Sequence, residues 1–162
     1  MKKNSEALSI RSYRTADLDI LKEITAEAFD GASIDQVIEK RHGLLNGQDW
    51  RSRKIQHIDI DIARETGTVY VGEIDNSVVG YITTWVDTAS CIGHIPNIAV
   101  KKGFRGKGIG RLLINHALDS FMTAGMTHAR IETLEINQVG YGLYTSIGFE
   151  EMVRQVHFIK KL

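Results

Sequence analysis

The stretch NIAVKKGFRGKGIGRLL, residues 97–113, constrains the fold more than any other part of the sequence. An apolar run precedes four glycines and five cations, and apolar residues at helical spacing follow them. Glycines let backbone N–H groups turn toward one point, and the N-terminus of a helix adds partial positive charge. The stretch therefore predicts a strand–turn–helix unit that binds a phosphate compound, and the cations favour a diphosphate over a single carboxylate.

Spacing excludes two common phosphate-binding motifs. A P-loop requires GxxxxGK followed by Ser or Thr, and no glycine here precedes a Gly-Lys pair at that interval. A dinucleotide fingerprint, GxGxxG, would need its third glycine where Arg111 or Leu113 stands. Two interpretations remain, a basic phosphate-binding turn of another kind and an ordinary connection with solvated lysines.

Composition limits the classes of protein. With 162 residues, 25% of them charged, the chain is expected to form a single domain over residues 1–162. Twenty cations balance 20 anions, which argues against a nucleic-acid partner. The single cysteine excludes an internal disulfide, and there is neither a signal-peptide pattern nor an apolar run of membrane-spanning length. We expect a cytoplasmic protein with no membrane partner and no metal.

The order of elements predicts an α/β fold with one mixed sheet and helices packed on it. Expected strands are residues 7–13, 68–74, 78–87, 91–100, 128–136 and closing material in 150–162; expected helices are 15–29, 34–45, 49–65, 108–124 and 138–147. Asp75-Asn76 indicates a hairpin turn, and Pro96 indicates an edge or a bulge. The alternation His57-x-Asp59-x-Asp61 would suit a metal-binding strand, but an isoleucine stripe across 49–65 favours a helix.

Two separate motifs resemble one family. Arg105, Gly108 and Gly110 fit the pattern R/Q-x-x-G-x-G/A after a strand that ends in AV. Residues 137–149, NQVGYGLYTSIGF, are similar to N-x-x-A-x-x-L-Y-x-x-x-G-F, with Gly140 in place of alanine. By these motifs the chain, from about residue 7 to the C-terminus, is identified as a member of the GNAT superfamily of N-acetyltransferases.

This resemblance implies a single GNAT domain and acetyl-CoA as cofactor. The sheet should have six to seven strands, with helices on both faces, and the strands 91–100 and 128–136 should splay apart where the cofactor binds. The pantetheine arm is implied to pair with the first of these strands, and the pyrophosphate to meet the amides of residues 105–110. The implied cofactor-binding residues are Ile98, Ala99, Val100, Arg105, Gly106, Lys107, Gly108, Ile109, Gly110, Arg111, Asn137 and Tyr144.

Acetyl transfer from a thioester to an amine needs a neutral amine, donors for the oxyanion and a proton for the thiolate. The resemblance implies direct attack in a ternary complex, so Cys91 is expected to be a core residue rather than a nucleophile. Tyr144 is the candidate general acid, because a phenol has a pKa of about 10 and stays protonated at neutral pH. Glu132 and His94 are both candidate general bases, and a water relay is the third option.

The acceptor is the least specified part. The resemblance implies that residues 28–60 and the DTAS loop recognise it, and we expect a small-molecule primary amine. The acidic residues of this region either attract a cationic amine or form solvated helix faces: Asp30, Asp35, Glu39, Asp49 and Asp87. Alternative functions are N-terminal acetylation of a protein or peptide, as by ribosomal-protein acetyltransferases, a non-catalytic acyl-CoA sensor, and a structural interaction domain. The C-terminal stretch RQVHFIKKL would be able to pair across a homodimer.

Overall fold

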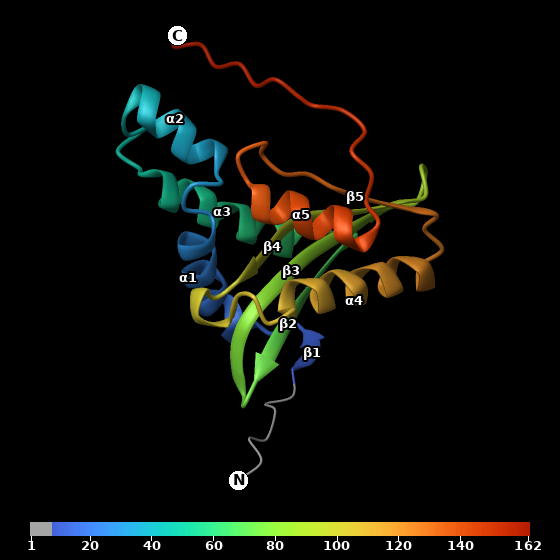
Figure 1. The fold of residues 1–162 in the computed structure, drawn as a ribbon. Helices are drawn as coiled ribbons and strands as arrows, with labels where there is room; N and C mark the ends of the chain where they lie inside the picture. Colours follow the sequence, from blue (N-terminus) through green and yellow to red (C-terminus); the bar gives the residue numbers. More distant parts are fainter. Residues whose placement is uncertain (1–7) are drawn as a thin grey trace.

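The computed structural model describes residues 8–162, so residues 1–7, including the expected start of the first strand at Ala7, lie outside it. Figure 1 shows one sheet with helices on both of its sides. The elements are β1 (Ser9–Ser12), a 3₁₀ turn (Thr15–Asp17), α1 (Leu18–Ala28), α2 (Ile34–His42), α3 (Trp50–Ala63), β2 (Gly67–Ile74), β3 (Ser77–Asp87), β4 (Ile92–Val100), a second 3₁₀ turn (Lys102–Phe104), α4 (Ile109–Thr123), β5 (His128–Ile131) and α5 (Gln138–Ile147).

The strands lie in the order β1-β2-β3-β4-β5. Strands β1 to β4 pair antiparallel with one another, and β5 is parallel to β4. Asp75 and Asn76 both have positive φ, 48° and 60°, which is the backbone that a tight hairpin turn requires. The predicted hairpin and the mixed character of the sheet are therefore confirmed.

Apolar residues cover both faces of the sheet. Helices α1 and α3 pack on one face through a cluster of Leu21, Ile24, Ile58, Val69, Val71, Tyr81 and Ala99. Helix α4 packs on the other face through a cluster that includes Ile82, Ile95, Leu113, Ile114 and Phe121, and α5 lies against the same cluster. Because β3 lies between the two clusters, its central residues are buried on both sides. Helices on both faces, as expected, are confirmed.

Strand β4 has a bulge at Pro96. Thr83 of β3 pairs with Asn97, but Trp85 pairs with His94, so Ile95 and Pro96 together face a single residue of β3. Pairing of β4 with β5 begins at Ile92 and stops at Ile95, while β4 itself continues to Val100. Pro96 has no N–H to donate to a ladder, which explains why the pairing stops there. The expected bulge is therefore present, and pairing between these two strands stops beside it.

The expected number of strands was wrong, because the described residues form five strands and not six or seven. Strand β5 ends at Ile131 instead of residue 136, where its pairing with β4 stops at Ile95, just before Pro96. Residues 150–162 form no strand within the described chain, and Val153 and Phe158 are 82% and 93% exposed. Their apolar residues do not alternate regularly, and the shortened β5 offers only a short edge on which to continue the sheet.

Candidate functional site

The glycine-rich turn has the geometry that its sequence predicts. Gly106 and Gly108 have φ of 75° and 80°, and beyond the adjacent residues no described heavy atom lies within 4 Å of a Cβ placed at either position. The positive φ is what favours glycine at both positions, because there is room for a larger side chain. Gly108 is the N-cap of α4, and Ile109 anchors the first turn of the helix in the core. The first N–H groups of α4 have no acceptor within the helix, so this end is suited to an anion.

The cations around the turn have different roles. The Arg105 Nε donates to the carbonyl of Val100 at 3.0 Å, which ties the turn to the end of β4. Arg111 donates to the carbonyl and the hydroxyl of Ser146 on α5, at 3.2 and 2.6 Å. Lys107 is exposed, with its Nζ 4.9 Å from the centre of the Phe104 ring. All three side chains are exposed; the two arginines also brace the turn through these hydrogen bonds, and Lys107 lies against the Phe104 ring.

The end of β4 presents an unpaired backbone edge. The side chain of Ala99 is buried on the α1–α3 face, and Ile98 and Val100 pack on the α4 face. On one side β4 is paired with β3 up to Val100, whereas its pairing with β5 on the other side has already stopped at Ile95. The Val100 carbonyl accepts from Arg105, and the other backbone N–H and C=O groups on that side are available to an extended ligand.

Helix α5, which carries Asn137 and Tyr144, packs on the α4 side of the sheet. Asn137 is the N-cap of α5, and its Oδ1 accepts from the N–H of Gly140 at 3.1 Å. Tyr144 is largely buried, and burial raises the pKa of its phenol to about 12. A Cβ at Gly140 would lie 2.5 Å from the Asn137 Nδ2 and 3.3 Å from the Tyr144 hydroxyl. The departure of Gly140 from the motif therefore makes room for these two polar groups.

His94 and Glu132 lie near each other where the pairing of β4 with β5 ends. His94 is opposite Arg130 in the sheet, and its ring stacks on Trp85 with centroids 3.8 Å apart. Burial, and then the charge of Arg130, lower the pKa of His94, so its imidazole is neutral at pH 7. Glu132 is 68% exposed and forms an ion pair with Arg130 at 2.5 Å. Within residues 8–162, no hydrogen bond joins Tyr144 to either candidate base.

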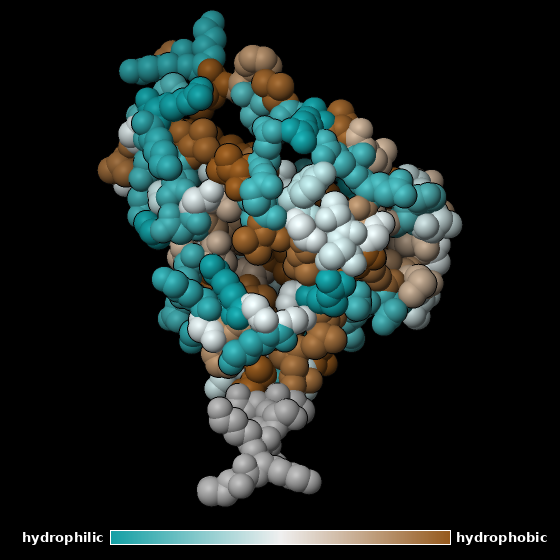
Figure 2. All heavy atoms as spheres, in the orientation of Figure 1, coloured by the Kyte–Doolittle hydropathy of each residue, from teal (hydrophilic) through white to brown (hydrophobic). Residues whose placement is uncertain are grey.

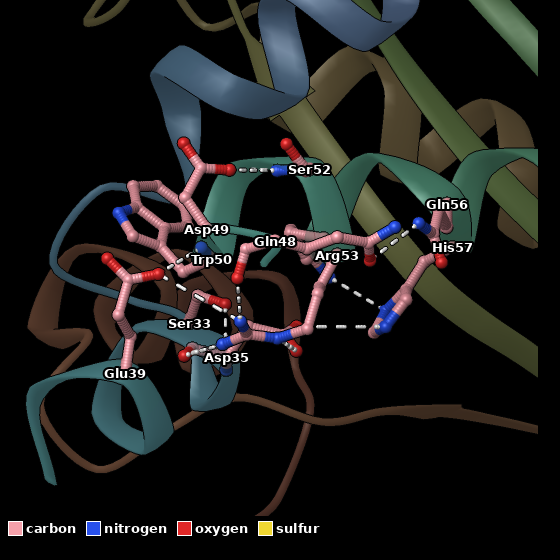
Figure 3. Close-up of polar contacts among 11 residues, drawn as sticks. Ser33, Asp35, Glu39, Gln48, Asp49, Trp50, Ser52, Arg53, Gln56 and His57 are labelled. Atoms are coloured by element: carbon pink, nitrogen blue, oxygen red, sulfur yellow. Dashed lines mark hydrogen bonds and ion pairs between the residues drawn. The ribbon is translucent and has the colours of Figure 1, made fainter. Parts of the chain in front are cut away.

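Four of the five candidate acidic residues serve the structure of the α2–α3 region, and Asp87 serves the turn after β3. Asp35 pairs with the Arg53 Nε at 3.5 Å, and Glu39 accepts from the backbone N–H of Trp50 (Figure 3). Asp30 pairs with Arg51 at 3.2 Å, Asp49 caps α3 by accepting from Ser52, and Asp87 accepts from Ser90. All five carboxylates thus have partners within the chain.

In the space-filling view, apolar side chains line a hollow between α2–α3 and α5 (Figure 2).

A buried polar network on α3, β3 and β4 was not expected from the sequence. Its members are Lys54, Asp61, Thr83 and Asn97, which are 8%, 6%, 0% and 5% exposed. Burial lowers the pKa of Lys54. The sequence contained one sign of this network. Lys54, Ile58 and Asp61 stand at positions i, i+4 and i+7 of the expected helix, so the two charged residues lie on the same inward face as the isoleucine. A charged residue on such a stripe needs a buried partner.

The structure also bears on the possible metal ligands in residues 49–65, on membrane-spanning segments and on Cys91. Helix α3 confirms the helical interpretation of residues 49–65, so His57 and Asp59 do not face one way as they would in a strand. In the part of the chain that the structure describes, no three His, Cys, Asp or Glu side chains converge as a metal site would require. None of the described helices is long and apolar enough to cross a membrane. Cys91 was expected in the core but is only partly buried.

Comparison with known sequences gives one family. The sequence model of the Acetyltransferase (GNAT) family matches residues 33–149. An uncharacterized N-acetyltransferase of Methanocaldococcus jannaschii is 29% identical over 144 residues, 88% of this chain and 78% of that protein. A streptothricin acetyltransferase of Escherichia coli is 31% identical over 129 residues, 78% of this chain and 69% of that enzyme. A ribosomal protein bS18 alanine N-acetyltransferase of Salmonella typhimurium is 38% identical over 55 residues, 34% of this chain and 37% of that enzyme.

Solved structures share the fold. The PaiA N-acetyltransferase of Thermoplasma acidophilum in complex with coenzyme A has a TM-score of 0.72 at 20% identity, covering 89% of this chain and 90% of that one. The aminoglycoside N-acetyltransferase AAC(6')-Iy in complex with CoA has a TM-score of 0.71 at 14% identity and full coverage of both chains. At these identities the agreement concerns the fold.

Proposed function

Because this chain belongs to the GNAT family of acetyltransferases and is an N-acetyltransferase, we propose that it transfers the acetyl group of acetyl-CoA to the primary amine of a small molecule. One observation carries the proposal, the position of the glycine turn at the N-terminus of α4 next to the unpaired edge of β4. A ligand that carries both a diphosphate and an extended arm would bind the diphosphate at the turn and the arm along the strand edge, so the two features must be adjacent.

The described residues fit this cofactor. The backbone of Ile98, Ala99 and Val100 would hold the pantetheine arm, and the N–H groups of residues 105–110 would hold the pyrophosphate. The cofactor supplies the acetyl group as a thioester. Arg105 and Arg111, which are hydrogen-bonded to Val100 and Ser146, keep the turn in shape, and Lys107 adds a further exposed positive charge.

Direct transfer in a ternary complex requires the chain to take one proton and give one. The nitrogen of the amine forms a bond to the acetyl carbon while the bond from that carbon to sulfur breaks. Neutral His94, or the exposed carboxylate of Glu132, would accept the proton of the amine. Tyr144 has a raised pKa of about 12, so it remains protonated and would donate to the sulfur.

A small-molecule acceptor is supported by the extent of the match to the streptothricin acetyltransferase, which includes the region before the hairpin. The test is thiol release from acetyl-CoA with streptothricin, sisomicin and a peptide with N-terminal alanine as acceptors. Turnover with an antibiotic amine supports the proposal. Failure of acetyl-CoA to bind would refute it, and binding without thiol release on any acceptor would favour the sensor.

Acetylation of a peptide N-terminus is the second candidate. It is favoured by the higher identity, 38%, of the shorter match to the bS18 alanine N-acetyltransferase. Turnover with the peptide alone would replace the first candidate with this one.

Variants in the site test the assigned roles. Tyr144→Phe should lower kcat while acetyl-CoA affinity stays nearly constant, because the phenol is needed for its proton. Glu132→Gln and His94→Ala should be compared in the acidic limb of kcat/KM. The acidic limb of the pH profile should shift in the variant that has lost the general base. If the limb is unchanged in both variants, neither residue is the base.

A further inference from the structure

The buried network links two opposite charges through one amide. The Lys54 Nζ donates to the Asn97 Oδ1 at 2.7 Å, and the Asn97 Nδ2 donates to the Asp61 Oδ2 at 2.7 Å. An ammonium can only donate and a carboxylate can only accept, so the charges allow the amide a single orientation. Asn97 is therefore held from both ends by α3.

The backbone of Asn97 is held by the same network. Its N–H donates to the Thr83 Oγ1 at 3.0 Å, and that hydroxyl donates to the Asp61 Oδ2 at 2.7 Å. Because Thr83 has one hydroxyl proton, this pair of bonds also sets the orientation of the hydroxyl. At the bulge, a side chain of β3 thus takes over as the acceptor for an N–H of β4.

The location of Asn97 gives the network a purpose beyond stability. Asn97 follows the bulge at Pro96, where pairing with β5 has ended, and precedes Ile98–Val100. This part of β4 is paired on one side only, so its position depends on β3 and on these side chains. Replacing a buried charged pair by apolar residues often leaves stability unchanged or raises it, so stability alone does not explain two buried charges.

We infer that Lys54, Asp61 and Thr83 are positioning residues that hold Asn97, and through it the backbone of Ile98–Val100, in the geometry that binds acetyl-CoA. This inference rests on the proposed function, because it assumes that the cofactor pairs with that backbone. The network acts through Asn97 and touches neither reacting group.

The experiment compares hydroxyl deletions at neighbouring positions of β3. Thr83→Val keeps the shape of the side chain but removes both hydrogen bonds, and Thr83→Ser keeps the hydroxyl. Thr84→Val is the control, because the Thr84 Oγ1 is also buried but donates to the Thr68 carbonyl at 2.9 Å, outside the network. Two quantities are measured, the Kd for acetyl-CoA by calorimetry and the hydrogen-exchange rate of the Asn97 amide by NMR.

Thr83→Val should raise the Kd about ten-fold, because it removes both hydrogen bonds that hold the Asn97 backbone, and should accelerate exchange of the Asn97 amide. Thr83→Ser and Thr84→Val should both stay within about two-fold of the wild-type Kd. Equal Kd values for Thr83→Val and Thr84→Val would overturn the inference alone. A wild-type protein that does not bind acetyl-CoA would overturn the proposed function as well.

A second pair of variants tests the network from its other end and serves if Thr83→Val does not fold. Lys54→Met should also weaken acetyl-CoA binding about ten-fold. Its control is Lys22→Met, because Lys22 forms an ion pair with Asp59 of the same helix α3, at 2.8 Å, on the surface. Equal Kd values for these two variants would contradict the inference.

Discussion

A buried hydroxyl pair between α1 and β3 offers a quantitative test of the core. Tyr81 and Thr25 are both fully buried, and their hydroxyl oxygens are 2.7 Å apart. The Thr25 hydroxyl donates to the Leu21 carbonyl at 2.7 Å, so the Tyr81 hydroxyl must be the donor to Thr25. Burial raises the pKa of Tyr81 far above its usual value, which keeps that donor protonated.

The direction of this bond predicts unequal effects of removing its two ends. Tyr81→Phe deletes the donor and leaves no unpaired N–H or O–H, so it should cost about 1 kcal/mol of unfolding free energy. Thr25→Val leaves the Tyr81 proton without an acceptor in the core and should cost about 2 kcal/mol. The double variant removes the stranded donor, so it should be more stable than Thr25→Val alone.

Urea unfolding followed by circular dichroism measures all four proteins of this cycle. In a domain of this size, about 1 kcal/mol corresponds to a shift of about 3 °C in Tm, which calorimetry resolves. A larger loss for Tyr81→Phe than for Thr25→Val, or losses that simply add, would refute the assigned donor. Acetyl-CoA affinity should be unchanged in Tyr81→Phe, because the phenol lies on the α1 side of the sheet.

Three further substitutions test other local features. Gly93→Ala places a Cβ 2.4 Å from the ring of Phe121 and should cost about 2 kcal/mol in urea unfolding; an unchanged midpoint would show that the ring moves aside freely. Gly108→Ala meets only a backbone penalty at φ 80°, so it should cost about 1 kcal/mol and weaken acetyl-CoA binding in calorimetry; full affinity would argue against the turn as the pyrophosphate site. The Arg11 guanidinium holds the pKa of Asp17 below its usual range. The pair therefore contributes its full stabilisation above the unfolded pKa of about 3.9, and this stabilisation is lost as the pH falls through the lower pKa of the folded state. Asp17→Asn should therefore lower Tm at pH 7 and have a smaller effect near pH 2, and an equal loss at both pH values would contradict this explanation.

Local patterns predicted much of the fold. The glycine turn, the hairpin at Asp75-Asn76 and the bulge at Pro96 were expected and are present. Each depends on the backbone preferences of one or two residues, so neighbouring sequence is sufficient to specify it. The motif at residues 137–149 likewise located α5, and only the structure identifies Asn137 as its N-cap.

The errors concern pairing between distant segments. Residues 128–136 have strand composition throughout, but β5 ends at Ile131 because its partner strand bulges at a proline more than 30 positions earlier. Residues 150–162 have apolar side chains but no regular alternation, and they do not join the sheet. Strand composition is a local property, whereas a strand needs a partner edge.

The sequence by itself determined which segments are helical, where the chain turns and which turn can bind a phosphate, because these follow from glycine, proline and apolar periodicity. Only the tertiary structure decided that Lys54, Asp61 and Thr83 meet Asn97 at the bulge of β4, from positions up to 43 residues away. Buried charges need partners that no local pattern names, and packing of α3 on the sheet supplies them.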